Sequence, residues 1–182
     1  AGNAAVPVSQ TITIEDTTPP EISPVPGPTT IGCTETPLFS TPTIFDVCDQ
    51  SPSLLFSDIT VNGSCPQTFS VTRTWTAFDC SGNSAISVSQ TINVVDDIDP
   101  TASNLVPVSV QCAGDVPAPD ITVVTDEADN CSVPVVAFVS DASDGGSCPE
   151  TVIRTYSVTD DCGNEILVTQ TITIGDNIPP TA

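Results

Sequence analysis

Cysteine and aspartate are the residue types in this sequence that could do chemistry. The chain has eight Cys, no His and no Met. It also lacks a Cys-x-x-Cys pair, so the ligand spacing of a zinc site or a thioredoxin-type redox motif is missing. An even number of cysteines without those motifs predicts disulfides, which form and persist in an oxidising compartment. We therefore expect an extracellular protein, at a cell surface or in a secreted filament.

The charge of the chain limits its partners. The 23 acidic residues face only Arg73 and Arg154, which leaves a formal net charge of -21. Nucleic acid and anionic membrane surfaces would repel such a chain, whereas cations would be attracted to it. No apolar run approaches the roughly 20 residues that span a bilayer, so we expect no direct membrane insertion. No signal segment opens the sequence, so we expect a mature or excised chain with any anchor elsewhere.

A repeat of 80 residues runs through the sequence. Equivalent residues lie 80 positions apart, namely Gln10, Gln90 and Gln170, and Asp16, Asp96 and Asp176. Self-similarity at a fixed period is typical of repeat architectures. We predict that residues 1–16 are the last strand of a preceding or neighbouring repeat. Residues 17–98 would form the first complete repeat, and residues 99–182 the second, with a linker to a next one.

Alternating apolar and polar residues predict strands in every repeat. Val6, Val8, Ile12 and Ile14 alternate with polar residues, as does the segment 68–77, and 18 Pro and 10 Gly supply turns. These features predict an all-β sandwich for each repeat, whose small core is marginal without disulfides. The strands expected in the first repeat are 21–33, 40–48, 53–61, 68–80 and 85–96.

Simple up-and-down alternation of these strands assigns the cysteines to the two ends of each repeat. In the first repeat Cys33 and Cys65 fall at one end, and Cys48 and Cys80 at the other, beside the incoming linker. Four cysteines allow three pairings, and we predict bridges between cysteines at the same end. Each bridge would close a loop of about 30 residues and stabilise the fold by about 3 to 4 kcal/mol. The predicted disulfides are Cys33–Cys65, Cys48–Cys80, Cys112–Cys148 and Cys131–Cys162.

The same alternation gathers carboxylates at the end of each repeat that receives the linker. Converging carboxylates repel one another unless a cation intervenes, and Ca²⁺ takes six to eight oxygen ligands in flexible geometry. A calcium-stiffened joint is one interpretation, and a solvated acidic surface whose charges never converge is the other. The sequence leaves both open, with the joint at 96–99 the stronger candidate for calcium. The candidate ligands are Glu15, Asp16, Asp46, Asp49, Asp79, Asp96, Asp97, Asp99, Asp126, Asp129 and Asp160.

The sequence offers little for catalysis. It has no His and no Lys to activate a nucleophile, and no Gly-rich loop that would cradle a phosphate. Paired acids could serve a glycosidase. The acids recur once per repeat, however, and periodic acids fit a stacked structural joint better than one active site. We therefore expect no enzymatic activity.

Several short motifs of the two repeats resemble a known family. The motifs are Asp46-Val47-Cys48, Gly63-Ser64-Cys65-Pro66, Arg73-Thr74-Trp75 and Gly82-Asn83, with Gly146-Ser147-Cys148-Pro149 and Arg154-Thr155-Tyr156 in the second repeat. In these motifs the chain resembles the four-cysteine hyalin-like (HYR-like) repeats of large bacterial surface adhesins of the Bacteroidota type. The resemblance implies a string of immunoglobulin-like sandwich repeats that serve binding or extension, without catalysis.

These observations predict a structural repeat of an extracellular stalk, adhesin or filament, extended by calcium-stiffened joints. Its partners would be neighbouring repeats or subunits of the same protein, together with surface glycans. Aromatic residues are scarce at 4%, which favours a passive stalk over an adhesive pocket. The alternative is a protomer of a fibril that inserts residues 4–14 into a neighbouring subunit by donor-strand exchange.

Two further features need a structural context. Asn62-Gly63-Ser64 is an N-glycosylation sequon, and Thr17 follows an Asp in a pattern similar to a bacterial O-glycosylation signal, so both residues are candidate sugar sites. Arg73 and Arg154 occupy matching strand positions in phase with apolar residues. We expect each guanidinium to stack on Trp75 or Tyr156, or to pair with a carboxylate.

Overall fold

The computed structural model describes residues 1–179, so the last three residues of the predicted second repeat lie outside it. The fold is all-β, as predicted, and no helix within the described residues is long and apolar enough to cross a bilayer. The strands are β1 (Glu21–Ile22), β2 (Thr29–Gly32), β3 (Ile44–Phe45), β4 (Ser53–Asn62), β5 (Phe69–Phe78), β6 (Val88–Val95), β7 (Val108–Val110), β8 (Val135–Ser143), β9 (Glu150–Thr159) and β10 (Glu165–Ile174). The 3-10 turns are η1 (Ala113–Asp115) and η2 (Ile121–Val123).

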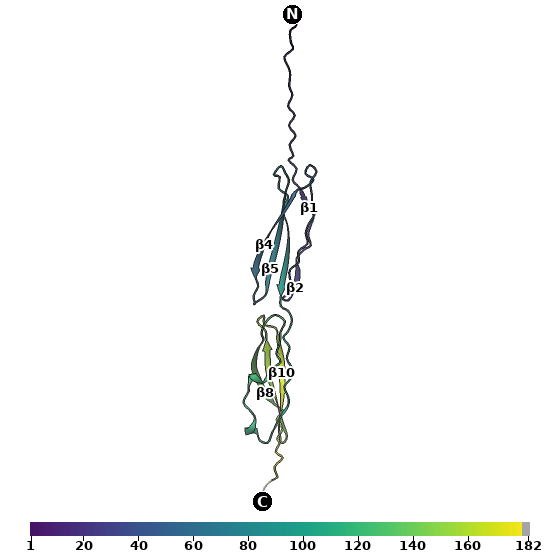
Figure 1. Cartoon of the computed structure of the whole chain (residues 1–182). Coiled ribbons are helices and arrows are strands. Elements are labelled where there is room, and N and C mark those ends of the chain that lie inside the picture. Colours follow the sequence, from purple (N-terminus) through teal and green to yellow (C-terminus); the bar gives the residue numbers. More distant parts are fainter. Residues whose placement is uncertain (180–182) are drawn as a thin grey trace. The chain divides into compact units, whose positions relative to one another are not determined.

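The strands form two four-stranded sheets and one small two-stranded sheet. Their orders are β2-β6-β5-β4, β7-β10-β9-β8 and β1-β3 (Figure 1). In the second large sheet β10 pairs with β9 in antiparallel register along its whole length and with β7 in parallel register. A register shift in β8 falls between Phe138 and Ser140. The last strand of the second repeat therefore lies in the middle of its own sheet.

The chain divides into two compact units that interleave in the sequence. The first contains residues 1–29, 38–60 and 71–92, and the second contains residues 30–37, 61–70 and the chain from residue 93 onward. The second unit therefore includes two short segments that belong to the first sequence repeat. This division reflects which residues lie close together in space, and it differs from the sequence repeat. The repeat boundaries at 17–98 and 99–182 stay a prediction.

The apolar phase predicted from the sequence forms the core of each sheet. In β5 the Trp75 and Ala77 side chains are buried, and the Phe39 ring meets the Trp75 ring edge-on with 6.2 Å between centroids. In β9 and β10, Tyr156 and Val168 are buried in one apolar cluster. Burying β-branched and aromatic side chains on one face is the main term that stabilises such a sheet.

The predicted strands 21–33 and 40–48 are much shorter in the structure. β1 and β2 are separated by Pro24, Pro26 and Pro28, and only β3 remains of the segment 40–48. Proline donates no backbone hydrogen bond, so it interrupts a sheet ladder wherever it recurs. The longer predicted strands 53–61, 68–80 and 85–96 contain no such run, and they appear as β4, β5 and β6.

The apolar residues near the start of the chain lie in extended backbone with no assigned strand. Val8 is 97% exposed and Ile14 is 92% exposed. Within the described structure, residues 4–14 therefore have no sheet of their own to complete. The assignment of residues 1–16 to the last strand of a preceding or neighbouring repeat stays a prediction.

Candidate disulfide and acidic sites

Two disulfides lie close together in the second compact unit, and each joins one sequence repeat to the next. Cys33 is bonded to Cys131 with 6.0 Å between their Cα atoms, and Cys65 is bonded to Cys162 with 5.1 Å between theirs. The predicted pairing of Cys33 with Cys65 and of Cys131 with Cys162 is therefore wrong. Disulfides are present, but the bonded partners come from different repeats.

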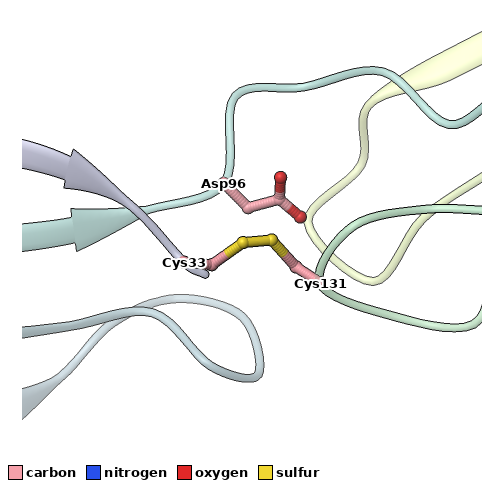
Figure 2. A group of neighbouring side chains, drawn as sticks. All are labelled: Cys33, Asp96 and Cys131. Carbon is pink, nitrogen blue, oxygen red and sulfur yellow. A yellow bond between two sulfur atoms is a disulfide. The ribbon is translucent and has the colours of Figure 1, made fainter. Parts of the chain in front are cut away.

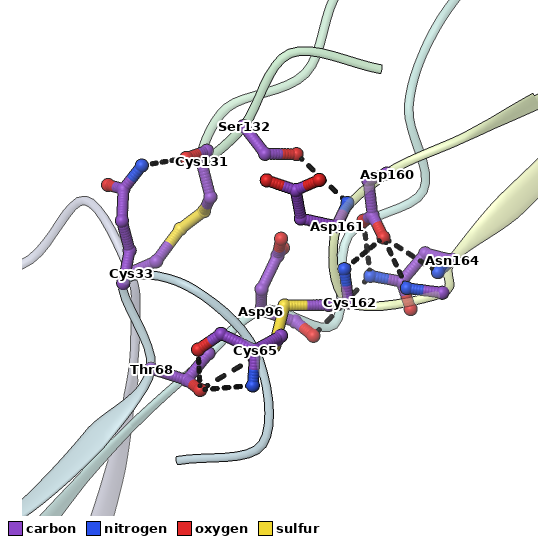
Figure 3. Close-up of a disulfide and its surroundings, with 12 residues drawn as sticks. Cys33, Cys65, Thr68, Asp96, Cys131, Ser132, Asp160, Asp161, Cys162 and Asn164 are labelled. Carbon is purple, nitrogen blue, oxygen red and sulfur yellow. Dashed lines mark hydrogen bonds between the residues drawn. A yellow bond between two sulfur atoms is a disulfide. The ribbon is translucent and has the colours of Figure 1, made fainter. Parts of the chain in front are cut away.

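The chain between the repeats explains why cysteines of one repeat do not bond to each other. Asp96 follows directly after β6, and its carboxylate lies beside the Cys33–Cys131 disulfide (Figure 2). Figure 3 shows the Asp96 side chain between the two bridges. The outgoing chain thus separates the loops of Cys33 and Cys65. Strand alternation within one repeat does not show where the cysteines of the next repeat lie.

Aspartate-capped turns present the two cysteines of the second repeat. Asp129 Oδ2 accepts hydrogen bonds from the backbone N–H groups of Cys131 at 2.8 Å and Ser132 at 2.7 Å. Asp160 Oδ1 accepts from the N–H of Cys162 at 2.8 Å (Figure 3). An Asp side chain that bonds its own backbone two residues on fixes a tight turn. These turns hold each sulfur in position for its partner.

The other four cysteines are free and exposed within residues 1–179. They are Cys48, Cys80, Cys112 and Cys148. The predicted bridges Cys48–Cys80 and Cys112–Cys148 are therefore not formed among the described residues. Nearby charge raises the pKa of the Cys48 thiol, first through Asp16 and then through burial and Asp46.

Three carboxylates converge in the first compact unit. One oxygen from each of Asp16, Asp46 and Asp79 lies within 4.8 Å of the others, and we call this group the first acidic cluster. Asp46 is 7% exposed, and its Oδ1 accepts from the backbone N–H groups of Cys48 and Asp49. Its Oδ2 and the Oδ2 of Asp16 are buried without a hydrogen-bond partner among the described residues. A buried carboxylate oxygen without a partner is destabilising.

The second compact unit holds a matching group, which we call the second acidic cluster. Asp96, Asp129 and Asp160 bring one oxygen each within 4.8 Å of the others. Asp96 Oδ2 and Asp129 Oδ1 are buried and unpartnered in the part of the chain that the structure describes. Burial raises the pKa of Asp96, and the charges of Asp129 and Asp160 add to the rise. The residues of the second cluster are thus equivalent in sequence to those of the first. In both clusters the unpartnered oxygens belong to the linker aspartate and to the aspartate before the first cysteine of the pair.

The third carboxylate of each cluster is fully engaged in the turn before the last strand. Asp79 accepts from the backbone N–H of Asn83 at 2.8 Å and from its Nδ2 at 2.7 Å, and Asn83 Nδ2 also donates to the backbone oxygen of Asp16 at 3.0 Å. Asn164 bonds Asp160 in the same way and donates to the backbone oxygen of Asp96 at 3.4 Å. These asparagines join the linker to the cluster.

The role of Asn83 and Asn164 was not among the features predicted from the sequence. Their signal was present, because Gly82-Asn83 and Gly163-Asn164 follow an Asp in both repeats. The glycines have φ of 89° and 93°, which a residue with a side chain rarely adopts, so the turn needs glycine before the asparagine.

Five of the predicted metal ligands lie outside both clusters. Asp49 instead accepts from the backbone N–H groups of Ser51 and Cys80, and Asp126 accepts from that of Ser103. Their carboxylates are therefore used to fix loops. The remaining three, Glu15, Asp97 and Asp99, are exposed.

Each arginine pairs with a carboxylate on the neighbouring strand, as the sequence predicted. Arg154 makes two parallel hydrogen bonds of 2.8 Å to Asp141, and its side chain is 3% exposed. Arg73 makes the same pair with Asp58 at 2.7 Å. The Arg73 guanidinium stacks on the Phe56 ring, 4.0 Å from its centroid, so the expected stacking partner Trp75 is replaced by phenylalanine.

The candidate sugar sites lie on exposed backbone. Asn62 is the last residue of β4 and is exposed. Thr17 follows Asp16 in the linker and is also exposed. Both positions are open to solvent, and glycosylation at them stays a prediction.

Comparison with known proteins gives one family and distant structural likenesses. No curated protein matches the chain significantly. Among solved structures, extracellular cadherin domains 1–4 of protocadherin gamma B7 match with 13% identity and a TM-score of 0.29, over 87% of this chain and 51% of that one. Domains EC1–3 of mouse clustered PcdhgC3 match with 15% identity and a TM-score of 0.31, over 88% of this chain and 68% of that one. The chain thus spans about half the length of the first of these.

The second sequence repeat matches a family model. Residues 100–174 match the model of the HYR-like domain with 4 cysteines, and the four cysteines of that range are Cys112, Cys131, Cys148 and Cys162. Two disulfides and the family agree with an extracellular location. Over residues 100–174 the chain is therefore similar to HYR-like domains with four cysteines.

Proposed function

We propose that this chain is a segment of an extracellular stalk or adhesin in which HYR-like repeats follow one another and bind Ca²⁺ where the linker enters each repeat. The observation that carries the proposal is the recurrence of one acidic cluster in two places. Asp16, Asp46 and Asp79 in the first cluster are equivalent in sequence to Asp96, Asp129 and Asp160 in the second. A site that recurs at equivalent positions favours a structural role that each repeat performs.

The donor set of each cluster fits a calcium ion. Two oxygens per cluster are buried without a partner, on Asp16 and Asp46 in the first and on Asp96 and Asp129 in the second. A hard divalent cation would satisfy both at once, and water or backbone carbonyls would complete its six to eight ligands. It would also remove the repulsion between neighbouring carboxylates that raises the pKa of Asp96.

A bound cation would stiffen the entry to each repeat. In both clusters one carboxylate comes from the linker and the other two come from loops of the repeat that follows. Binding would therefore fix the linker against two loops that aspartate and asparagine hydrogen bonds already order. We infer a structural role with neighbouring repeats of the same protein as partners, without catalysis, and with sugars at exposed positions such as Asn62 and Thr17.

Donor-strand assembly has less support. That alternative gains if β10 cannot stay in its own sheet, and β10 pairs with β9 from Glu165 to Ile174. β6 likewise lies inside the sheet of the first repeat. Within residues 1–179, each large sheet thus contains the last strand of its own repeat.

The test is thermal unfolding of the oxidised chain with about 1 mM Ca²⁺ and with excess chelator. With a Kd of about 10⁻⁴ M, typical of extracellular calcium modules, each site would add about 1.4 kcal/mol of stability. For a chain of this size that corresponds to a rise in Tm of about 3 to 6 °C per site. Equilibrium dialysis should find one ion per cluster.

Two variants at adjacent positions provide the matched control. Asp96→Asn removes a carboxylate of the second cluster, and Asp97→Asn removes the same charge from an exposed neighbour. We expect Asp96→Asn to lose one bound ion and part of the calcium-dependent rise, while Asp97→Asn keeps both. A Tm that calcium leaves unchanged, or equal effects of the two variants, would contradict the calcium proposal.

A further inference from the structure

Two unbonded cysteines of the first repeat stand where the second repeat has bonded ones. Cys48 and Cys80 are the equivalents of Cys131 and Cys162, although Cys80 lies one residue earlier in its turn. Cys131 and Cys162 are not bonded to each other, and each is bonded to a cysteine of the repeat before theirs. Equivalent positions in successive repeats are expected to make equivalent contacts. Cys48 and Cys80 are therefore candidates for bonds to a repeat before theirs.

The loops that carry Cys48 and Cys80 are ordered and open to solvent. Asp46 Oδ1 accepts from the backbone N–H of Cys48 at 2.8 Å, and Asp129 makes the same bond in the loop that is bonded. Asp49 Oδ2 accepts from the backbone N–H of Cys80 at 2.8 Å, which ties the two loops together. Both cysteines are exposed. A bridge at either position would therefore require little new order in these loops.

The linker before the first repeat is held in the same way as the linker between the two repeats. Asn83 Nδ2 donates to the backbone oxygen of Asp16 at 3.0 Å, as Asn164 Nδ2 donates to that of Asp96 at 3.4 Å. Beside Asp96, Cys65 and its bonded partner line one hollow. The chain that enters at Asp16 therefore comes to the first acidic cluster from the direction in which the bonded joint has its preceding repeat.

The other two unbonded cysteines match the opposite side of the bonded joint. Cys112 and Cys148 are the second-repeat equivalents of Cys33 and Cys65, and a Ser-Cys-Pro motif surrounds both Cys65 and Cys148. Cys148 lines a hollow together with Asp176, as Cys65 does with the equivalent aspartate of its own repeat. This end of the second repeat thus has the groups that the first repeat uses to bond its successor.

Exposed thiols also fit poorly with the expected location of the protein. Disulfides form and persist in an oxidising compartment, so thiols that can reach a partner are oxidised there. Cys48, Cys80, Cys112 and Cys148 are all exposed, and none is bonded within residues 1–179. The equivalents of these cysteines choose partners across a joint, which favours the same choice here over a bond within one repeat.

We propose that Cys48 and Cys80 form disulfides with two cysteines of a preceding repeat of the same polypeptide, and that Cys112 and Cys148 do so with a following repeat. Each joint of the string would then carry the double bridge that Cys33–Cys131 and Cys65–Cys162 make between the two repeats. The chain's own Asp16 segment would be the linker of the preceding joint. This pairing rests on the proposed succession of repeats, and it does not require calcium.

The chemistry is thiol–disulfide exchange with a low-molecular-weight disulfide. One cysteine thiolate attacks that disulfide, forms a mixed disulfide and releases one small thiolate. The thiolate of the partner cysteine then attacks the mixed disulfide and releases the second. For each bridge two protein thiols are oxidised, one small disulfide is reduced to two thiols, and the two protons leave with the small thiols or to solvent.

The first test is disulfide mapping of the mature protein from its natural source, with free thiols alkylated before proteolysis. We expect the peptides of Cys48 and Cys80 to be bonded to peptides from outside residues 1–182, and the same for Cys112 and Cys148. A Cys48–Cys80 bond, a Cys112–Cys148 bond, or alkylated thiols at these positions would overturn the proposal.

The second test supplies a preceding repeat from the chain's own sequence. Residues 1–96 are followed by residues 17–182, so that the first repeat occurs twice and Asp96 takes the place of Asp16 at the new joint. After refolding with reduced and oxidised glutathione, mapping should find Cys33 bonded to Cys48 and Cys65 bonded to Cys80. The 182-residue chain should give neither bond and should keep its four free thiols.

Two double variants of the lengthened chain provide a matched control. Cys33→Ser/Cys65→Ser in the first copy of the repeat removes the partners, so Cys48 and Cys80 of the second copy should become free thiols. Cys48→Ser/Cys80→Ser in the first copy changes cysteines that have no repeat before them, and every bond should remain. Equal bonding in the two variants would contradict the proposed pairing.

The native bridges Cys33–Cys131 and Cys65–Cys162 report whether the lengthened chain has folded. If they form while Cys48 and Cys80 of the second copy stay free, the double bridge at other joints is overturned and the succession of repeats still stands. If they do not form, the mapping of the mature protein decides. Refolding is done with Ca²⁺ and with chelator, and equal bonding in both supports the disulfides independently of the calcium proposal.

Discussion

The ion pair between Arg154 and Asp141 makes the stability of the fold depend on pH. The Arg154 guanidinium donates two hydrogen bonds to Asp141, and these lower the pKa of the Asp141 carboxyl below its usual value while partial burial opposes the shift. A carboxyl whose pKa is lowered in the folded state stabilises the fold above its unfolded pKa of about 3.9. That stabilisation is lost as the pH falls through the folded pKa, below about pH 4.

Asp141→Asn tests this dependence. Near pH 7 the variant leaves the buried Arg154 without its ion pair, and we expect a loss of about 2 to 3 kcal/mol in the free energy of unfolding. The difference from wild type should shrink below about pH 4, where Asp141 of the wild type also becomes neutral. Urea denaturation from pH 7 to pH 3 measures it. Asp58→Asn is the control, since its partner Arg73 is 25% exposed and a smaller effect is expected. A difference that grows with acid would contradict the argument.

The sequence showed some single-residue contacts and could not show others. Pairing of Arg73 and Arg154 with carboxylates followed from their apolar phase, because a cation on a strand face with apolar neighbours needs a partner. The choice of Phe56 in place of Trp75 depends on which strands are neighbours, and alternation along one strand does not contain that information.

At the scale of elements, the turn before the last strand does most to place the acidic clusters. Asn164 reaches from this turn to Asp160 Oδ2 at 2.7 Å and to the backbone oxygen of Asp96. Hydrogen bonds within the turn also hold the pKa of Asp160 below its usual value although burial acts to raise it. The Gly163-Asn164 pair thus holds the turn, the linker at Asp96 and the Asp160 carboxylate together.

Asn164→Ala should remove the hydrogen bonds that join this turn to Asp160 and to the backbone of Asp96. Asp160 is 7% exposed, so the loss of its side-chain donor leaves a buried acceptor unsatisfied, and we expect a loss of about 1 to 3 kcal/mol. Asn83→Ala should have a similar effect in the first cluster. Denaturant unfolding measures both, with Asn3→Ala in the exposed segment 1–14 as the control. A stability equal to that of the control in both variants would show that the asparagines are dispensable.

Prediction of elements from sequence succeeded where strands are long and failed where proline recurs. β4, β5 and β6 follow the predicted segments, because ten or so alternating residues carry a clear signal. The segment 21–33 was predicted as one strand, although Pro24, Pro26 and Pro28 were visible in it. Because these prolines donate no backbone hydrogen bond, alternating apolar residues do not form one continuous strand there.

At the scale of the whole molecule, the disulfides close far larger loops than the sequence suggested. The bonded cysteines are 98 and 97 residues apart, where loops of about 30 residues had been expected. The disulfide pairing depends on where the cysteines of the neighbouring repeat lie. The pattern within a single repeat therefore does not predict the pairing. The convergence of Asp16, Asp46 and Asp79 was predictable, since all three belong to one repeat and its own linker.

Replacing both members of one bridge tests its contribution. In the chain-entropy model a loop of about 100 residues stabilises the folded state by about 4 to 5 kcal/mol. We expect Cys33→Ser/Cys131→Ser to lose about that much in guanidinium denaturation. Cys112→Ser/Cys148→Ser, which removes two unbonded cysteines, should change stability little in the monomer. Equal stabilities of the two double variants would contradict the observed pairing.

The covalent path through the chain also changes how the protein would bear a pulling force. In the predicted division into repeats, residues 97–99 are the peptide connection between the two repeats, and the bridges from Cys33 to Cys131 and from Cys65 to Cys162 connect the same two repeats. Tension applied to the two ends is therefore shared by three covalent connections. One broken peptide bond between residues 97 and 99 leaves both halves attached, so a fibre of such joints tolerates damage that would sever an ordinary linker.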